Sequence, residues 1–295
     1  MVNTRILTQA FEYFEPKTIQ GAVKLLDKYD EEAKVIAGGS DLLVQMKQEM
    51  VNPKYLISIN KIPKLNYLKN SGSLQIGAAT ILHDVLSFCA RDGKYVALFE
   101  AIKSLGTVQI RNVGTIGGNI CNASPAADSA PPLLVFNARV KLCSVRGEKL
   151  LPLTDFFKGV NLTVMAPNEI LTKIEIPPVP QGLGSAFMKI TRVCADISKV
   201  SAAAALERDG DICTSCLIAL GAVAPVPMRV EEAEKFVIGK RIKPGLLEEA
   251  GKKAAEEIKP IDDIRSTAQY RRKVAAVLVR EVLWNAWQRT TPQEL

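Results

Sequence analysis

The sequence predicts an α+β protein of two domains, in which the second domain is a small antiparallel sheet followed by helices. Three observations carry this prediction. The chain has 295 residues, which exceeds the usual size of a single domain. Residues 177–184 contain three prolines and two glycines and therefore indicate a linker. Beyond that linker, strand-like runs come first and helical patterns follow, an order typical of α+β domains.

The first domain is predicted to mix short strands and amphipathic helices. Its first helix begins after Thr18, a favoured N-cap, because apolar residues then recur with helical spacing. A strand ending at Ala37 leads through two glycines to a helix opened by Ser40 and Asp41. Further elements are strands within 54–59 and 73–78, a helix at 80–93 capped by Thr80 and stopped by Gly93, a helix within 95–106, and a hairpin within 138–153 that turns at Arg146 and Gly147.

The second domain is predicted to contain strands within 185–192, 196–207 and 211–223, then helices within 246–258 and 269–287. Cys213 and Cys216 form a CxxC motif in the third of these strands. Residues three apart on a strand point to opposite faces, and no second CxxC or nearby histidine completes a zinc site. The two cysteines are therefore expected to be small hydrophobic residues of the core.

Composition excludes several classes of protein. The net charge is +7, but the basic residues are scattered, which argues against nucleic-acid binding. The N-terminal residues do not resemble a signal peptide, and no run is long enough to span a membrane. We therefore expect a cytoplasmic protein whose six cysteines are reduced. No cysteine set has iron–sulfur ligand spacing.

Two glycine motifs indicate where the chain binds a ligand. The motif "VIAGGSDLL" spans 35–43 and "GTIGGNICN" spans 114–122, and the second opens a stretch of small residues that reaches residue 132. Neither matches the dinucleotide fingerprint or the P-loop. Together they suit a ligand with a diphosphate, which backbone N–H groups bind, oriented by Asn119 and Asp128. The alternative is a pair of tight turns in a packed sheet, with Ser40 and Asp41 as ordinary N-caps.

The two motifs in this order resemble those of the FAD-binding subunit of molybdenum hydroxylases, the xanthine dehydrogenase and carbon monoxide dehydrogenase flavoprotein family. The resemblance covers nearly the whole chain, including "SAFMKITRVCADISKV" and "IDDIRSTAQYRRKVAAVLVREVL". It implies a two-part FAD-binding domain of the vanillyl-alcohol-oxidase/PCMH type at 1–177, with parts at about 1–58 and 59–177. It also implies an α+β domain of the carbon monoxide dehydrogenase flavoprotein type at 178–295.

The resemblance also implies which residues bind FAD without a covalent link. The first motif and the second would embrace the pyrophosphate, Asp128 would lie near the ribityl chain or the polar edge of the flavin, and Leu171 and Lys189 match flavin-side positions more loosely. The full expected set is Ala37, Gly38, Gly39, Ser40, Asp41, Thr115, Gly117, Gly118, Asn119, Asp128, Leu171 and Lys189. No metal ligand is expected. Val193 stands where relatives often carry a second arginine, and the inserted cysteine-rich segment of some relatives is absent.

The activity implied is that of an oxidoreductase subunit. Molybdopterin would lie on a large partner subunit and 2Fe-2S clusters on a small one, and FAD here would pass their electrons to NAD or another acceptor. Two alternatives remain, a self-sufficient flavin oxidase and a non-catalytic nucleotide-binding module. Free oxidases commonly carry a substrate base, but the single histidine, His83, lies in a predicted helix away from both motifs.

Overall fold

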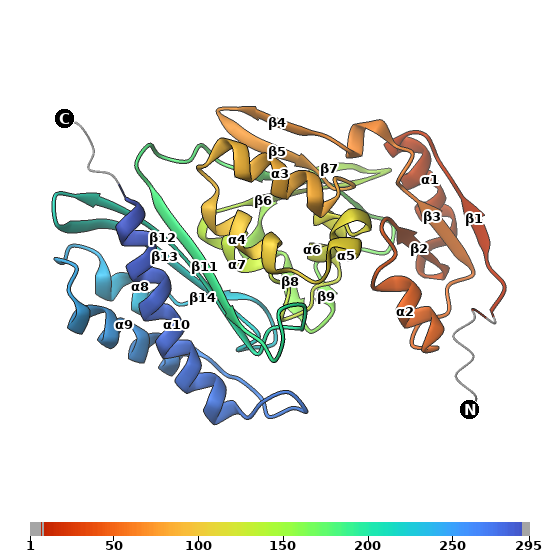
Figure 1. The fold of residues 1–295 in the computed structure, drawn as a ribbon. Coiled ribbons are helices and arrows are strands. Elements are labelled where there is room, and N and C mark those ends of the chain that lie inside the picture. The colour runs from red at the N-terminus through yellow and green to blue at the C-terminus, as the bar shows by residue number, and fades with distance from the viewer. Residues whose placement is uncertain (1–6, 8, 291–295) are drawn as a thin grey trace.

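The computed structural model describes residues 7 and 9–290, which form three sheet-centred units in a row (Figure 1). The N-terminal unit is at one end, the C-terminal unit at the other, and the middle unit packs against both. The architecture confirms the α+β class, with a smaller C-terminal domain of antiparallel sheet and helices.

The N-terminal unit is built on a parallel sheet. Its three strands have the order β1-β3-β2, and both neighbouring pairs are parallel. Thr18 caps the first helix as predicted, since its Oγ1 accepts a hydrogen bond from the Gly21 N–H at 3.0 Å. The elements are β1 (Glu12–Phe14), α1 (Ile19–Tyr29), β2 (Ala33–Ile36), α2 (Leu42–Lys47) and β3 (Tyr55–Ser58).

The middle unit is an antiparallel sheet with helices packed on it. The strand order is β4-β5-β10-β6-β7, so β10 returns to the centre of the sheet after a long excursion of the chain. Its strands are β4 (Leu68–Ser71), β5 (Ser73–Gly77), β6 (Arg139–Ser144), β7 (Gly147–Pro152) and β10 (Ile170–Ile176), with a small ribbon of β8 (Phe157–Gly159) and β9 (Leu162–Thr163). Its helices are α3 (Leu82–Asp92), α4 (Val96–Ser104), α5 (Val108–Val113), α6 (Ile116–Cys121) and α7 (Ala130–Val135).

One predicted cap in this unit is wrong. Helix α3 has Ile81 at its N-cap, while the Thr80 hydroxyl donates to the Tyr67 carbonyl at 3.0 Å and accepts from the Tyr67 N–H at 3.2 Å. Thr80 thus bridges to a neighbouring segment, which no local pattern reveals. The C-terminal stop is confirmed, since Gly93 adopts φ 76°.

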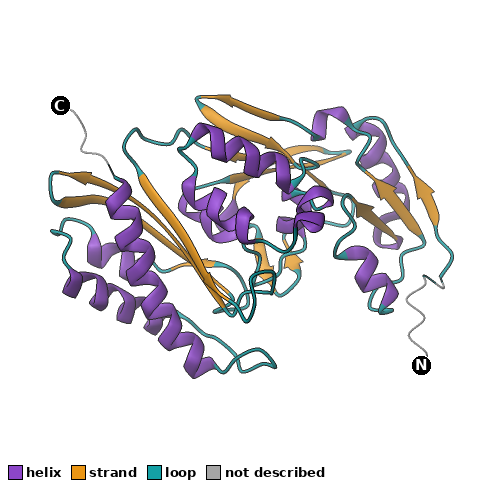
Figure 2. Cartoon of the chain, viewed as in Figure 1, coloured by secondary structure: helices purple, strands orange, loops and turns teal. Residues whose placement is uncertain are grey.

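The C-terminal unit is a four-stranded antiparallel sheet of order β11-β12-β13-β14. Helix α10 packs along β11 and β12, and helices α4 and α7 of the middle unit contact the same sheet. The helices α8, α9 and α10 gather on the side away from the middle unit (Figure 2). The elements are β11 (Gly184–Ile190), β12 (Val200–Asp209), β13 (Ile212–Gly221), β14 (Met228–Arg229), α8 (Glu231–Val237), α9 (Pro244–Glu257) and α10 (Ala268–Arg289).

The CxxC pair lies in the core of this unit, but not on opposite faces of its strand. A bulge between β12 and β13 leaves Thr214 unpaired and exposed, so that Cys213 and Cys216 turn to the same side. Both side chains belong to the same buried cluster and are at most 1% exposed. All six cysteines are free thiols, and no group of three potential ligands for a metal ion occurs within the described residues.

Cys213→Ala and Cys216→Ala are each expected to lower the free energy of unfolding by about 1 kcal/mol, because each deletes one buried sulfur. Chemical denaturation measures the loss, and elemental analysis should find the metal content unchanged. The exposed Cys194 provides the control, since Cys194→Ala should leave stability unaltered. A zinc or iron signal that disappears with Cys213 or Cys216 would contradict the packing role.

Candidate functional site

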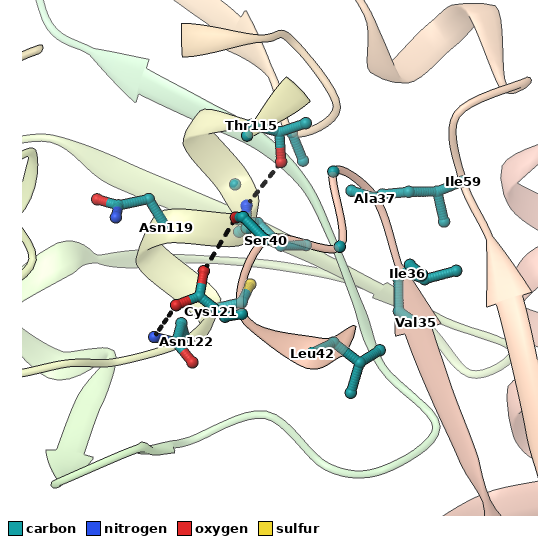
Figure 3. A pocket seen from close by; sticks show the side chains of 18 of the residues that line it. Val35, Ile36, Ala37, Ser40, Leu42, Ile59, Thr115, Asn119, Cys121 and Asn122 are labelled. Atoms are coloured by element: carbon teal, nitrogen blue, oxygen red, sulfur yellow. Dashed lines mark hydrogen bonds between the residues drawn. The ribbon is translucent and has the colours of Figure 1, made fainter. Parts of the chain in front are cut away.

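A cavity of about 420 Å³ opens between the N-terminal unit and the middle unit, where the two glycine motifs meet. Its volume falls within the range typical of small-molecule sites. Figure 3 shows the side chains that converge on it from β2, the following loop, α2 and α6. Ten of the twelve predicted site residues line it: Ala37, Gly38, Gly39, Ser40, Asp41, Thr115, Gly117, Gly118, Asn119 and Leu171.

The loop between β2 and α2, residues 37–41, lines this cavity. The amides of residues 38 to 41 have no hydrogen-bond partner in the part of the chain that the structure describes. Gly39 has φ 70°, a conformation that favours glycine and turns the chain back toward α2. Consecutive unpaired N–H groups in such a turn bind anions such as phosphate.

Gly38 is required by the protein itself. A Cβ atom at this position would lie 2.0 Å from the carbonyl oxygen of Val113, so the first motif and the segment before the second are in backbone contact. This contact brings the two motifs to one place although they are far apart in the sequence. Because Gly38 has no side chain, the two segments that form the walls of the cavity can pack against each other.

The second motif forms the short helix α6, and its first amides are already used. The N–H groups of Ile116 and Gly117 bond to carbonyls of Thr80 and Ala78, and the Gly118 N–H bonds to Thr115 Oγ1 at 3.0 Å. The expectation that both motifs offer free N–H groups thus holds only for the first. Thr115 is the N-cap of α6, which explains a threonine at this position.

The two glycines of α6 have different surroundings. A Cβ on Gly117 would lie 2.4 Å from the Ala78 carbonyl oxygen, so this glycine lets α6 pack on the chain that follows β5. Apart from the backbone of α6 and the neighbouring residues, a Cβ on Gly118 would meet one atom of the described chain within 4 Å, Thr115 Oγ1 at 2.9 Å. Because Gly118 also lines the cavity, the space beside it is open to a ligand.

The remaining walls differ in polarity. Asp41 is bonded to Ser40 and Asn122, and Asn119 Oδ1 accepts a hydrogen bond from Ser129 at 2.6 Å. The apolar wall includes Ile36, Leu42, Ile59, Leu105, Ile110, Ile170 and Leu171. A cavity with unpaired amides, a polar wall and an apolar wall suits a ligand that combines an anion with a flat ring.

Cys121 also faces the cavity, and its sulfur lies 3.7 Å from that of Met165. Burial raises the pKa of the Cys121 thiol to about 12. The thiol is therefore protonated at neutral pH, and only a thiolate is an effective nucleophile.

Asp128 and Lys189 do not line the cavity. Lys189 Nζ lies 2.6 Å from Asp128 Oδ2, and the Ser198 hydroxyl donates to the other carboxylate oxygen at 2.6 Å. Burial raises the pKa of Asp128, while the ammonium of Lys189 acts in the opposite sense. The pair joins the middle unit to β11, and its charged atoms are bonded to each other. His83 lies exposed on α3 and is not among the residues that line the cavity.

Comparison with known proteins decides the family. Residues 9–179 match the family described as the FAD binding domain in molybdopterin dehydrogenase, and residues 185–286 match the CO dehydrogenase flavoprotein C-terminal domain. The first match alone covers more than half of the chain. The chain belongs to the FAD-binding medium-subunit family of the molybdenum hydroxylases.

Medium chains of several enzymes are similar over nearly their full length. The glyceraldehyde dehydrogenase medium chain of Sulfolobus acidocaldarius is 36% identical over 269 residues, covering 91% of this chain and 95% of that one. The carbon monoxide dehydrogenase medium chain of Hydrogenophaga pseudoflava is 33% identical over 280 residues, covering 95% and 98%. The xanthine dehydrogenase FAD-binding subunit of Escherichia coli O157:H7 is 30% identical over 278 residues, covering 93% and 95%.

Solved structures agree with this assignment. A chain of carbon monoxide dehydrogenase from Hydrogenophaga pseudoflava, in a form that lacks the Mo-pyranopterin moiety of the molybdenum cofactor, superposes with a TM-score of 0.94. The identity is 32%, over 97% of this chain and 100% of that one. Quinoline 2-oxidoreductase of Pseudomonas putida 86 gives a TM-score of 0.88 at 28% identity, over 95% and 97%. The family is one of oxidoreductase flavoproteins, and FAD is its cofactor.

Several residues that line the cavity were not predicted from the sequence. Gln45 and Asn122 line it and are hydrogen-bonded to each other, and Ile110 and Met165 contribute to its apolar surface. Asn122 ends the second motif, so its amide was a visible signal. Met165 lies in an irregular segment, and nothing local marks it.

Across the described residues, no helix is both long and apolar enough to cross a bilayer.

Proposed function

We propose that this chain is the FAD-binding electron-transfer subunit of a cytoplasmic multi-subunit molybdenum hydroxylase. It receives electrons from 2Fe-2S centres of a small partner subunit, which obtains them from a large molybdopterin subunit, and passes them through FAD to NAD or another acceptor. The observation that carries the proposal is the row of four amides at residues 38–41, unpaired within the described residues, in a cavity that also has an apolar wall and the open face of Gly118.

The residues present fit FAD. The amides of Gly38, Gly39, Ser40 and Asp41 would hold the pyrophosphate, and the open face of Gly118 would admit the cofactor against α6. The apolar wall, which includes Leu171, would exclude water from a flat ring. When bound, FAD supplies the ability to accept an electron pair and to pass it on singly or as hydride.

Partner subunits are inferred from the relatives, which are named medium chains or FAD subunits and imply companion chains. We place the domain boundary at 177/178 and divide the first domain near residue 58. The division is supported by the end of β10 at Ile176 and the start of β11 at Gly184. For Asp128 and Lys189, contact with the flavin stays a prediction, since each charge is now satisfied by the other.

FAD is expected to be non-covalent and present at one per chain. Cys121 is the cysteine of the cavity, and its raised pKa disfavours the thiolate that a covalent link requires. Acid precipitation of the purified protein should release all flavin into the supernatant, where its spectrum gives the stoichiometry. Flavin that stays with the denatured pellet would contradict this prediction, and protein without any bound flavin would contradict the proposed function.

A further inference from the structure

Hydrogen bonds among the side chains of Asp41, Gln45 and Asn122, here called the clasp, connect the loop of residues 37–41 (the first loop) and helix α2 to the end of helix α6. Asn122 Nδ2 donates to Asp41 Oδ1 at 3.2 Å, and Gln45 Nε2 donates to Asn122 Oδ1 at 3.3 Å. Asn122 is the C-cap of α6, whereas Asp41 and Gln45 flank the start of α2. In Figure 3 a dashed line marks the bond at Asn122, below and to the left of Ser40. The clasp uses both functional atoms of one amide to connect two units of the fold.

The clasp completes the attachment of the first loop. At its N-terminal end the loop is fixed by the backbone contact of Gly38 with Val113. At its C-terminal end the described side-chain contacts to the second motif are those of Asp41 and Gln45 with Asn122. These two attachments bound the segment of residues 38–41, whose amides have no hydrogen-bond partner among the described residues. A loop that is ordered before binding loses less conformational entropy when its ligand arrives.

The clasp also explains an acidic residue at a site for an anion. A carboxylate beside a pyrophosphate would repel it, since like charges disfavour one another at short range, so an acidic residue here calls for a role other than binding the anion. Asp41 directs one carboxylate oxygen to Asn122 and the other to Ser40 Oγ at 3.2 Å. Its carboxylate therefore has a role within the protein.

We propose that Asn122 is a positioning residue that holds the first loop in its FAD-binding conformation through Asp41 and Gln45. This inference rests on the proposed function and deepens it, because it separates the amides that contact the cofactor from the side chains that orient those amides. Asp41 acts as an acceptor in the clasp. Neither side chain needs to contact FAD.

The test is the affinity of the apoprotein for FAD, measured by flavin fluorescence titration, with thermal unfolding of each apoprotein as the second readout. Asn122→Leu keeps the size of the side chain and removes both hydrogen bonds, and it should raise the Kd about five- to tenfold. Asn122→Asp should raise it further, because two carboxylates then face each other. The unfolding temperature of both apoproteins should change little, since the clasp is partly exposed.

A double-mutant cycle gives the sharper result. Asp41→Asn combined with Asn122→Asp exchanges donor and acceptor and retains the bond from Gln45, so the pair should recover most of the native affinity. Asp41→Asn alone is the control for the lost charge. The change in Kd that Asp41→Asn causes in the native background should be smaller than the fall in Kd that it causes beside Asn122→Asp. Equal effects in the two backgrounds, or native affinity in Asn122→Leu, would overturn the clasp. A native chain that binds no FAD would instead refute the proposed function.

Discussion

Gly118→Val should abolish FAD binding while leaving the chain folded. The new side chain would project into the cavity, because Gly118 lines it and, apart from the backbone of α6 and the neighbouring residues, Thr115 Oγ1 is the described atom within 4 Å of the Cβ position. A branched side chain in a closely packed binding surface costs a few kcal/mol, so the Kd should rise about a hundredfold or more. The backbone itself does not oppose the substitution, since Gly118 lies in helix α6 and is not among the glycines with positive φ.

Flavin occupancy after purification and the unfolding temperature of the apoprotein measure the two halves of this prediction. Disturbing the cap at Thr115 should cost about 1 kcal/mol of stability. The matched control is Gly245→Val, in the first turn of α9 and exposed, where a Cβ meets nothing within 4 Å. Full flavin occupancy in Gly118→Val would show that the cofactor lies elsewhere.

Gly38→Ala is expected to have the largest effect on the fold itself. Its methyl group would overlap the Val113 carbonyl, with 2.0 Å between the two atoms, and a backbone atom cannot move aside as a flexible side chain can. Relief of the overlap requires the two motifs to separate, at a cost of about 3 kcal/mol or more. FAD binding should fail together with stability.

The apoprotein separates this glycine from Gly118. Gly38→Ala should lower the unfolding temperature without any cofactor present, whereas Gly118→Val should lower it only slightly. Gly245→Ala, in an open helical position, controls for the loss of glycine. An apoprotein of native stability carrying Gly38→Ala would show that the two motifs are not joined by this contact.

Local signals in the sequence were sufficient for much of the fold and part of the site. Thr18 caps the start of α1 and Gly93 the end of α3 through contacts within their own turns, so the local sequence alone identifies both caps. The two glycine motifs are likewise contiguous segments, and ten of the twelve predicted residues lie around one cavity. What the sequence could not show was the reason for each glycine, because the reason lies in a distant segment: Val113 for Gly38 and Ala78 for Gly117.

The errors have the same origin. Thr80 bonds to Tyr67 across a loop, and the bulge at Thr214 reverses the face of Cys213. Helices α5, α6 and α7, of six residues each, and α8, of seven, were also missed, because they are shorter than the window of about 11–18 residues over which a helical pattern is recognised. The ion pair of Asp128 with Lys189, which spans two units of the fold, was likewise not foreseen, while the contact of these residues with the flavin stays a prediction. Apart from the short helices, each of these features depends on contacts between separate segments of the chain.

Anaerobic mixing of the FAD-reconstituted single chain with hydroxylation substrates tests the electron-transfer assignment most directly. We expect xanthine, carbon monoxide and aromatic substrates to leave the flavin absorbance unchanged, while dithionite bleaches it and NADH bleaches it if nicotinamide is the acceptor. The substrates should reduce the flavin only when the copurifying partner subunits are present. Bleaching of the isolated chain by any hydroxylation substrate would contradict the account and identify a self-sufficient flavin oxidase.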